Sequence, residues 1–425
     1  MTVDRPLRVL FACIAHPTHF QSMVPLAWAL RAAGHEVRVA SQGALADTIT
    51  GAGLTAVPVG EDHGLERVLA AKAEGSAPTI DFGALRSGEP DFDWLLGFYT
   101  MLVPTFFAAV NNESMVDDLV TLAREWEPDL VVWEPLTWAG GVAALASGAA
   151  HARLLWGPDV LGRTREHFVR ALDRLPPEHR DDPLGEWLGW TLRRHGLDFD
   201  ESVTRGDWAI EQDPPSVRIA VGQHTVPMRY VPYNGPAVVP GWVRTPPARP
   251  RVCVSLGVSA RNGMGTSTVS LGDLLDGLSD LDAEVVATLN AGQRAGLTSV
   301  PGNVRLVEFV PLHALLPSCS AIVHHGGAGT WGTAMRYAVP QVVVPEIWDA
   351  PLKAAMLADT GAGLVQRAGE LTPGSLRAKV SRVLGEPSFA EAARRLRDEQ
   401  QAQPAPAAVV GELERLTSKY RRERG

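Results

Sequence analysis

The chain of 425 residues is 45% hydrophobic and 20% charged, and its net charge is −9. These values are typical of a globular protein with two or three domains, and the absence of a long basic run argues against nucleic acid as a partner. The first apolar run ends at His16 and Pro17, so it is too short to cross a membrane and lacks the layout of a signal peptide. Cys13, Cys253 and Cys319 lie in or beside apolar runs without metal-binding spacing, so we expect free thiols and a cytoplasmic protein.

Apolar runs alternate with helical patterns through the first half of the chain. Parallel strands covered on both faces read as continuous apolar runs, and Gly34 is a typical helix stop. The pattern predicts strands at residues 7–15, 36–40, 55–59, 129–133 and 152–156, and helices at residues 21–33, 117–126 and 139–146. This alternation indicates a doubly wound α/β domain.

Aromatic residues interrupt the alternation between residues 60 and 112. Phe98, Tyr99 and Phe106 are candidates for lining an apolar substrate pocket, because long insertions often cover binding sites. Each ring could equally pack the insertion onto its own domain.

Residues 160–202 form an amphipathic helical pattern with Trp187, Trp190 and Leu192 on its apolar side. Such a surface could cover a pocket or contact another protein. It could also simply pack within its own domain.

A second series of strands and helices follows a proline-rich stretch at residues 233–250. Its predicted strands lie at residues 252–256, 284–288, 304–310, 321–324, 341–344 and 363–366. We therefore predict two doubly wound, Rossmann-like domains that face each other across a cleft. The predicted parts are an N-terminal domain (1–235), a linker (236–250), a C-terminal domain (251–402) and a C-terminal helix (403–425) that returns toward the first domain.

The stretch from Ser320 to Asp349 carries the clearest motif. A buried strand runs into a turn containing Gly326, Gly327 and Gly329, and a helix opens near Thr330. The free N–H groups and positive dipole of such a helix start attract a phosphate or diphosphate, and glycines let the anion approach the backbone. A glycine run alone is also consistent with a tight turn.

Polar residues follow two strands of the first domain. His19 lies just after the first strand and Glu134 just after the strand at residues 129–133. An imidazole accepts a proton near neutral pH, and a carboxylate on its other nitrogen fixes its tautomer. We interpret His19 as a general base oriented by Glu134, with a local helix-capping role as the alternative.

Metal chemistry is not indicated. Adjacent residues of a strand point to opposite faces, so His324 and His325 do not share one ligand. The Asp-x-Asp triplets that begin at Asp91, Asp198 and Asp280 fall among turn and helix-start residues and are interpreted as caps. We expect no metal and no cofactor.

The motifs HHGGAGT, FVPLHALLP, WD and THFQSMVPLAWALRAAGHEVRVAS together resemble those of GT-B glycosyltransferases that act on natural products. The stretches WEPLTWAG, HARLLWGPDV, PPEHRDDPLGEWLGWTL and MRYVPYNGPAVVP resemble the macrolide desosaminyl and mycaminosyl transferases more closely. The resemblance covers essentially the whole chain. It implies an inverting, metal-independent transfer of a deoxyamino sugar from a dTDP donor to a macrolide hydroxyl, with the dTDP-sugar as co-substrate.

The resemblance also assigns residues. His19 takes the general-base position, and Glu134 stands where many relatives have aspartate. The remaining assignments concern the donor nucleotide, for which we expect contacts from Ser255, Gly257, Phe309, Val310, His325, Gly327, Gly329 and Thr330.

Two polar residues after the strand at 341–344, Glu346 and Asp349, are candidates for binding the donor sugar. Many relatives have Asp-Gln here, whereas this chain has Asp349 and Ala350. A carboxylate without the glutamine amide suits an ammonium group better than a hydroxylated sugar. We hypothesise that Asp349 contacts the dimethylamino group of the donor.

The resemblance further implies a cytochrome P450-like activator protein, for which residues 160–192 are the candidate docking surface. Alternatives are a different deoxysugar or aglycone, a nucleotide-sugar epimerase on the same plan, and a non-catalytic nucleotide-sugar-binding helper. A nicotinamide-dependent oxidoreductase is disfavoured because AHPTHF, and not a glycine fingerprint, follows the first strand.

Overall fold

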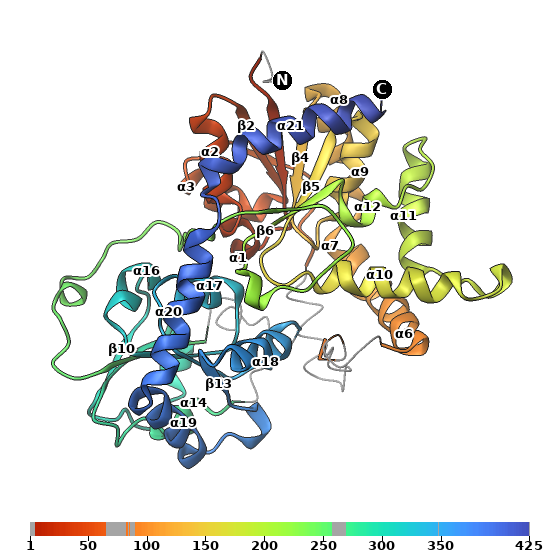
Figure 1. The fold of residues 1–425 in the computed structure, drawn as a ribbon. Coiled ribbons are helices and arrows are strands. Elements are labelled where there is room, and N and C mark those ends of the chain that lie inside the picture. The colour runs from red at the N-terminus through yellow and green to blue at the C-terminus, as the bar shows by residue number, and fades with distance from the viewer. Residues whose placement is uncertain are drawn as a thin grey trace.

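A computed structural model describes residues 5–64, 82–83, 85, 90–256, 269–346 and 348–424. It contains two α/β domains, each built on a parallel sheet, stacked one above the other in Figure 1. This is the predicted GT-B-like fold class.

The first sheet has seven parallel strands in the order β3-β2-β1-β4-β5-β6-β7. Its strands are β1 (Arg8–Ala12), β2 (Glu36–Ser41), β3 (Ala56–Pro58), β4 (Leu130–Trp133), β5 (Ala150–Leu154), β6 (Trp208–Glu211) and β7 (Thr225–Pro227). The strand order reverses between β1 and β4, and their residues Ala12 and Trp133 are paired at the carboxyl ends. Ligands of doubly wound sheets bind at such a switch point.

The helices of this domain cover both faces of the sheet (Figure 1). They are α1 (Pro17–Gln21), α2 (Val24–Ala32), α3 (Ala46–Gly51), α6 (Phe92–Leu102), α7 (Ala108–Val110), α8 (Glu113–Trp126), α9 (Trp138–Ser147), α10 (Val160–Asp173), α11 (Pro183–Arg194) and α12 (Ser202–Arg205). The helix predicted from about residue 21 to 33 is observed as α2, which begins three residues later than predicted, after the separate helix α1. Pro25 has no N–H to continue the hydrogen-bond ladder across Ser22 and Met23.

The second sheet has six parallel strands in the order β10-β9-β8-β11-β12-β13. They are β8 (Arg251–Ser255), β9 (Glu284–Thr288), β10 (Val304–Val307), β11 (Ala321–His324), β12 (Gln341–Val343) and β13 (Gly363–Val365). The order reverses between β8 and β11, where Ser255 pairs with His324. The helices are α14 (Leu271–Asp276), α15 (Ala291–Ala295), α16 (Leu312–Leu315), α17 (Ala328–Arg336), α18 (Ala350–Thr360), α19 (Pro373–Gly385), α20 (Pro387–Ala402) and α21 (Pro406–Arg424).

The last helix, α21, packs on the first domain although it follows the second (Figure 1). Its Val410, Leu413 and Leu416 are buried in the same hydrophobic cluster as strands β1 and β5. Glu414 lies 3.1 Å from His35 Nε2. The C-terminal helix therefore ties the two domains together.

One helical stretch among the described residues, Phe92–Val110, is long and apolar enough by composition to cross a membrane. Leu95, Tyr99 and Leu102 on this stretch are buried in the core cluster of the first domain. The stretch therefore contributes to the core of the first domain.

Candidate functional site

The residues predicted to carry catalysis meet at the first switch point. His19 is on α1, directly after β1, and Glu134 directly follows β4, so the two adjacent strands bring them together. His19 Nδ1 lies 2.9 Å from Glu134 Oε2. Because Nδ1–H donates to this carboxylate, the lone pair of the neutral ring is on Nε2, which can accept a proton.

Glu134 is fully buried, yet its surroundings keep it charged. Its oxygens accept hydrogen bonds from the Leu136 N–H at 3.0 Å, from the Thr137 hydroxyl and from Trp156 Nε1 at 3.1 Å, besides His19. Burial alone would raise the pKa of Glu134, but the charge of His19 and the hydrogen bonds from His19, Thr137 and Leu136 outweigh it and lower the pKa to about 2. A permanent negative charge therefore faces His19.

Trp156 was missed by the sequence analysis, which treated it as the end of an apolar strand. It follows β5 and donates to the same oxygen that binds His19. The centroids of the Trp156 and His19 rings are 5.3 Å apart, with the rings edge to face. The motif HARLLWGPDV contained it, but no residue spacing distinguished a hydrogen-bonding indole from a packed one.

The second switch point carries the glycine turn. Gly326 has a φ of +94°, and Gly327 is the N-cap of α17 without a side-chain capping bond. The first N–H groups of α17, up to the buried Thr330, are therefore available to an anion. Burial and the nearby Lys353 ammonium lower the pKa of His325 to about 4, so its ring is neutral at physiological pH.

Position 327 is occupied by glycine for a steric reason. A Cβ there would lie 2.6 Å from His325 Nε2. Glycine lets the His325 ring lie against the turn. Gly257, also predicted to bind the donor, lies outside the described residues, whereas Ser255 is buried at the end of β8.

The two adjacent histidines face different surroundings, as predicted. His324 is fully buried, with Nε2 2.8 Å from Gln341 Oε1, and its Nδ1 accepts from the Gly326 N–H. Among the described residues, no group of three or more His, Cys, Asp or Glu side chains could hold a metal ion. Asp91 caps α6 by accepting from the Trp94 N–H, as interpreted above.

Phe309 and Val310 follow β10 and differ in exposure. Phe309 is 44% exposed and can offer a ring face to a base, whereas Val310 is buried. The segment after them is held by Asn234, whose side-chain oxygen lies 2.9 Å from His313 Nδ1. From the same stretch, the Tyr230 hydroxyl donates to the Gly329 carbonyl at 3.0 Å.

Asp349 lies at the start of α18, and the structure gives it a partner that the sequence analysis did not foresee. Its Oδ2 is 2.9 Å from Nζ of the buried Lys353, one helical turn later. A Cβ on Gly157 of the first domain would be 3.1 Å from the same oxygen. Asp349 therefore faces the loop that carries Trp156, at the junction of the domains. Glu346 lies in the same β12–α18 connection.

The three predicted acceptor rings are all buried in the core cluster of the first domain. Phe98 and Tyr99 are buried, and Tyr99 packs against Phe168 at 4.9 Å. These contacts match the alternative in which the rings pack the insertion onto its own domain. Phe106 differs, because its ring lies 5.2 Å from Trp348 of the second domain, whose φ of +56° is unusual for a bulky residue.

Known proteins share this architecture. Models of the Erythromycin biosynthesis protein CIII-like N-terminal and C-terminal domains match residues 28–257 and 272–416. The chain is 56% identical to the 10-deoxymethynolide desosaminyltransferase of Streptomyces venezuelae, over 98% of both chains. It is 52% identical to the tylactone mycaminosyltransferase of Streptomyces fradiae, over 99% of this chain and 94% of that one.

A solved structure, that of the glycosyltransferase VinC in complex with dTDP, superposes with a TM-score of 0.88 at 42% identity. It covers 97% of this chain and 100% of that chain. The matches extend over both domains and therefore over both switch points. The chain belongs to the erythromycin biosynthesis protein CIII-like family and is a glycosyltransferase of the GT-B fold.

Proposed function

We propose that this glycosyltransferase transfers a deoxyamino sugar, of the desosamine or mycaminose type, from a dTDP-sugar donor to a hydroxyl of a macrolide aglycone. The names of the two curated relatives support this donor and acceptor class. The observation that carries the chemistry is the hydrogen bond of 2.9 Å between His19 and a buried, ionised Glu134 at the switch point. A cytoplasmic location fits the three free cysteines.

The mechanism is an inverting displacement. Nε2 of His19 takes the proton of the acceptor hydroxyl while the oxygen attacks the anomeric carbon from the face opposite the nucleotide. The bond between that carbon and the diphosphate oxygen breaks, and dTDP leaves with one more negative charge. Glu134 stabilises the imidazolium, and the uncapped N-terminus of α17 stabilises the leaving diphosphate.

Residues at the start of α18 select the donor sugar in this proposal. Asp349 presents a carboxylate that is shared with Lys353 at 2.9 Å. A protonated dimethylamino group would provide a second positive partner for this carboxylate, whereas a neutral sugar would not. Phe309 would stack on the thymine base, and the first N–H groups of α17 would bind the diphosphate. This binding requires no metal or cofactor.

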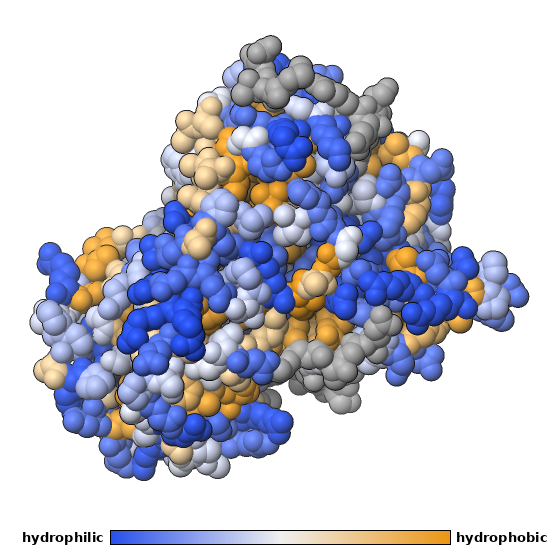
Figure 2. Space-filling view, viewed as in Figure 1, coloured by the Kyte–Doolittle hydropathy of each residue, from blue (hydrophilic) through white to orange (hydrophobic). Residues whose placement is uncertain are grey.

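An activator protein of the cytochrome P450-like class is part of the proposal. Helices α10 and α11 project from the first domain, and Figure 2 shows their arm as mainly hydrophilic. Trp190 on this arm is 59% exposed, whereas Trp187 packs against Trp138 at 6.1 Å. Trp190→Ser should therefore weaken copurification with the activator without unfolding the enzyme. Trp187→Ser is expected to destabilise the fold, because Trp187 packs in the core. If the Trp190→Ser variant still copurifies with the activator, α11 is not the docking surface.

Mass spectrometry of a macrolactone incubated with the enzyme and dTDP-desosamine, with and without activator, tests the function. Formation of the glycoside is expected, and its dependence on the activator measures that requirement. Absence of product in both reactions, with dTDP still bound, would contradict this donor and acceptor pair. That result would also favour the alternative that the protein is a non-catalytic helper that binds a nucleotide sugar.

A further inference from the structure

We propose that Trp156 is a positioning residue that limits how tightly the His19–Glu134 pair holds a proton. This inference rests on the proposed general-base role of His19. Its basis is that the indole N–H of Trp156 and Nδ1 of His19 converge on one oxygen of Glu134.

The contacts at this oxygen are crowded. Glu134 Oε2 lies 2.9 Å from His19 Nδ1, 3.0 Å from the Leu136 backbone N and 3.1 Å from Trp156 Nε1. Each donor stabilises part of the negative charge of a carboxylate that has no contact with solvent. With Trp156 in place, less of that charge is left to stabilise the imidazolium. A base that holds its proton less tightly is neutral, and ready to accept, at lower pH.

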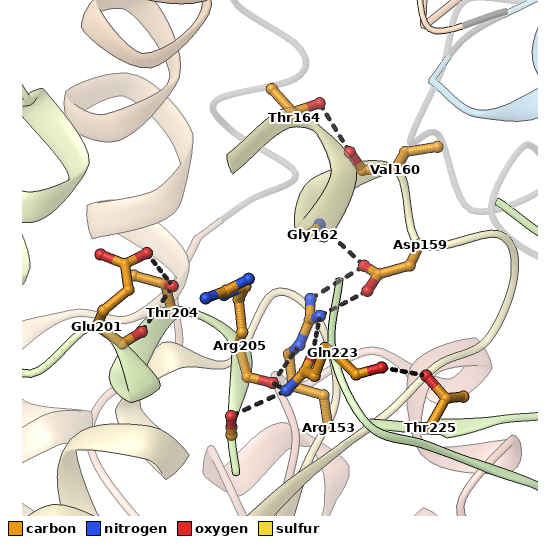
Figure 3. Close-up of polar contacts among 11 residues, drawn as sticks. Arg153, Asp159, Val160, Gly162, Thr164, Glu201, Thr204, Arg205, Gln223 and Thr225 are labelled. Carbon is orange, nitrogen blue, oxygen red and sulfur yellow. Dashed lines mark hydrogen bonds and ion pairs between the residues drawn. The ribbon is translucent and has the colours of Figure 1, made fainter. Parts of the chain in front are cut away.

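The loop that carries Trp156 is fixed at both ends. Arg153, buried on β5, donates to the two carboxylate oxygens of Asp159 at 3.0 and 2.6 Å and to the Arg205 carbonyl at 2.8 Å. Asp159 also accepts from the Gly162 N–H and so caps α10. Figure 3 shows these contacts. Trp156 lies between two anchored residues, which gives its N–H a defined direction.

Glu134 dominates the charge that faces His19. His16, whose ring centroid is 5.2 Å from that of His19, is neutral at physiological pH because burial and the charges of His19 and His63 lower its pKa to about 3. Burial raises the pKa of Cys13, near Glu134, so this thiol is neutral as well. A change at Trp156 therefore reaches His19 through the Glu134 carboxylate.

The test is the pH dependence of kcat/KM for Trp156→Phe, which keeps a ring and removes the N–H. One hydrogen bond to a charged group corresponds to about one pH unit, and because this bond reaches His19 only through Glu134, the acid limb should move to higher pH by a part of that amount. The high-pH plateau should change little. The matched control is Trp138→Phe, since the Trp138 N–H is buried without a partner among the described residues and its loss should leave the limb in place.

An acid limb that stays in place, or that moves to lower pH, would overturn the inference. If Trp156→Phe is too slow to assay, titration of the His19 C2–H resonance in the full chain gives the same answer, with His19→Gln used to assign it. The two proposals fail differently. If His19→Gln keeps wild-type kcat/KM, the general-base role itself is wrong. Lost activity in His19→Gln with an unshifted limb in Trp156→Phe rejects the role of Trp156 alone.

Discussion

At the scale of single residues, the site shows how a buried carboxylate is kept ionised. Glu134 has a pKa lowered to about 2, below its ordinary value of 4.5. A lowered folded-state pKa contributes stability that is present above the ordinary value and is lost as the pH falls through about 2. Around neutral pH, Glu134 therefore acts as a fixed charge, and the pH dependence of catalysis has to come from other groups.

Asp349 is where charge should decide donor choice. Asp349→Asn keeps the shape of the side chain and removes the charge that would meet an ammonium group. We expect kcat/KM for dTDP-desosamine to fall about 10- to 100-fold, the loss of one hydrogen bond to a charged group. The value for a neutral dTDP-deoxysugar, assayed in parallel as the control, should fall far less. Equal losses with both donors would show that Asp349 supports the fold through Lys353 and does not read donor charge.

At the scale of elements, the start of α17 forms the anion site because two features coincide. The N-cap Gly327 leaves the helix N–H groups uncapped, and Tyr230 binds the Gly329 carbonyl from the other domain. The turn is therefore fixed by a residue that follows β7. Tyr230 belongs to the stretch MRYVPYNGPAVVP, which resembles the desosaminyl and mycaminosyl transferases. This stretch therefore contacts the anion site although it lies outside the glycine motif.

Gly327→Ala tests the steric part of that argument. The added methyl would lie 2.6 Å from His325 Nε2, so either the ring or the turn would have to shift. We expect dTDP affinity, measured by calorimetry, to fall about tenfold, since displacing one or two donors costs on the order of 1 kcal/mol or more. Gly374→Ala, in the first turn of α19 with nothing within 4 Å of the new methyl, is the control. Unchanged dTDP affinity in Gly327→Ala would remove His325 and the turn from the diphosphate site.

Strands that lie in continuous apolar runs were predictable from the sequence. The buried strands β1, β4, β8 and β11 fall inside continuous apolar runs, so their chain positions were evident. Strands β6 and β7 were missed because they lie among turn-forming residues, and not because they are short, since the three-residue strands β12 and β13 were predicted. Trp156 and Lys353 act through hydrogen bonds and an ion pair that depend on the folded chain, and neither contact leaves a periodic signal.

At the scale of the whole molecule, the domains meet through side chains close to the site. Leu352 and Trp348 of the second domain pack against the core cluster of the first, and Trp331 Nε1 donates to Asp213 at 3.3 Å. Figure 2 shows hydrophobic residues gathered where the two lobes meet. The contacts between the domains and the proposed donor site therefore involve the same helices, α17 and α18.

Asp213 makes the stability of this junction depend on pH. Burial, reinforced by the charge of Asp349, raises the pKa of Asp213 from 3.8 to about 6, despite Lys353 and the Trp331 N–H. The folded state holds this proton more tightly than the unfolded state, so stability falls as the pH rises from about 4 to about 6 and stays low above that.

Asp213→Asn removes this penalty and keeps an acceptor for Trp331. Between about pH 5 and pH 8, wild type should lose roughly 1 kcal/mol of stability that the variant does not lose. Thermal melts of both proteins at the two pH values measure the difference, with the exposed Asp173→Asn as control. A variant that is less stable than wild type by the same margin at both pH values would show that the Asp213 charge is needed by Lys353.

The most direct test of the central claim compares catalysis with nucleotide binding in His19→Ala. The initial rate of desosamine transfer and the Kd for dTDP would be measured on the same preparation. Loss of a general base should lower kcat about 10²- to 10⁴-fold, and dTDP affinity should stay within about twofold because α17 and Phe309 are untouched. Glu134→Gln should lie between wild type and His19→Ala. A comparable loss of dTDP affinity, or an unchanged rate, would contradict the assignment of His19 as the base of this glycosyltransferase.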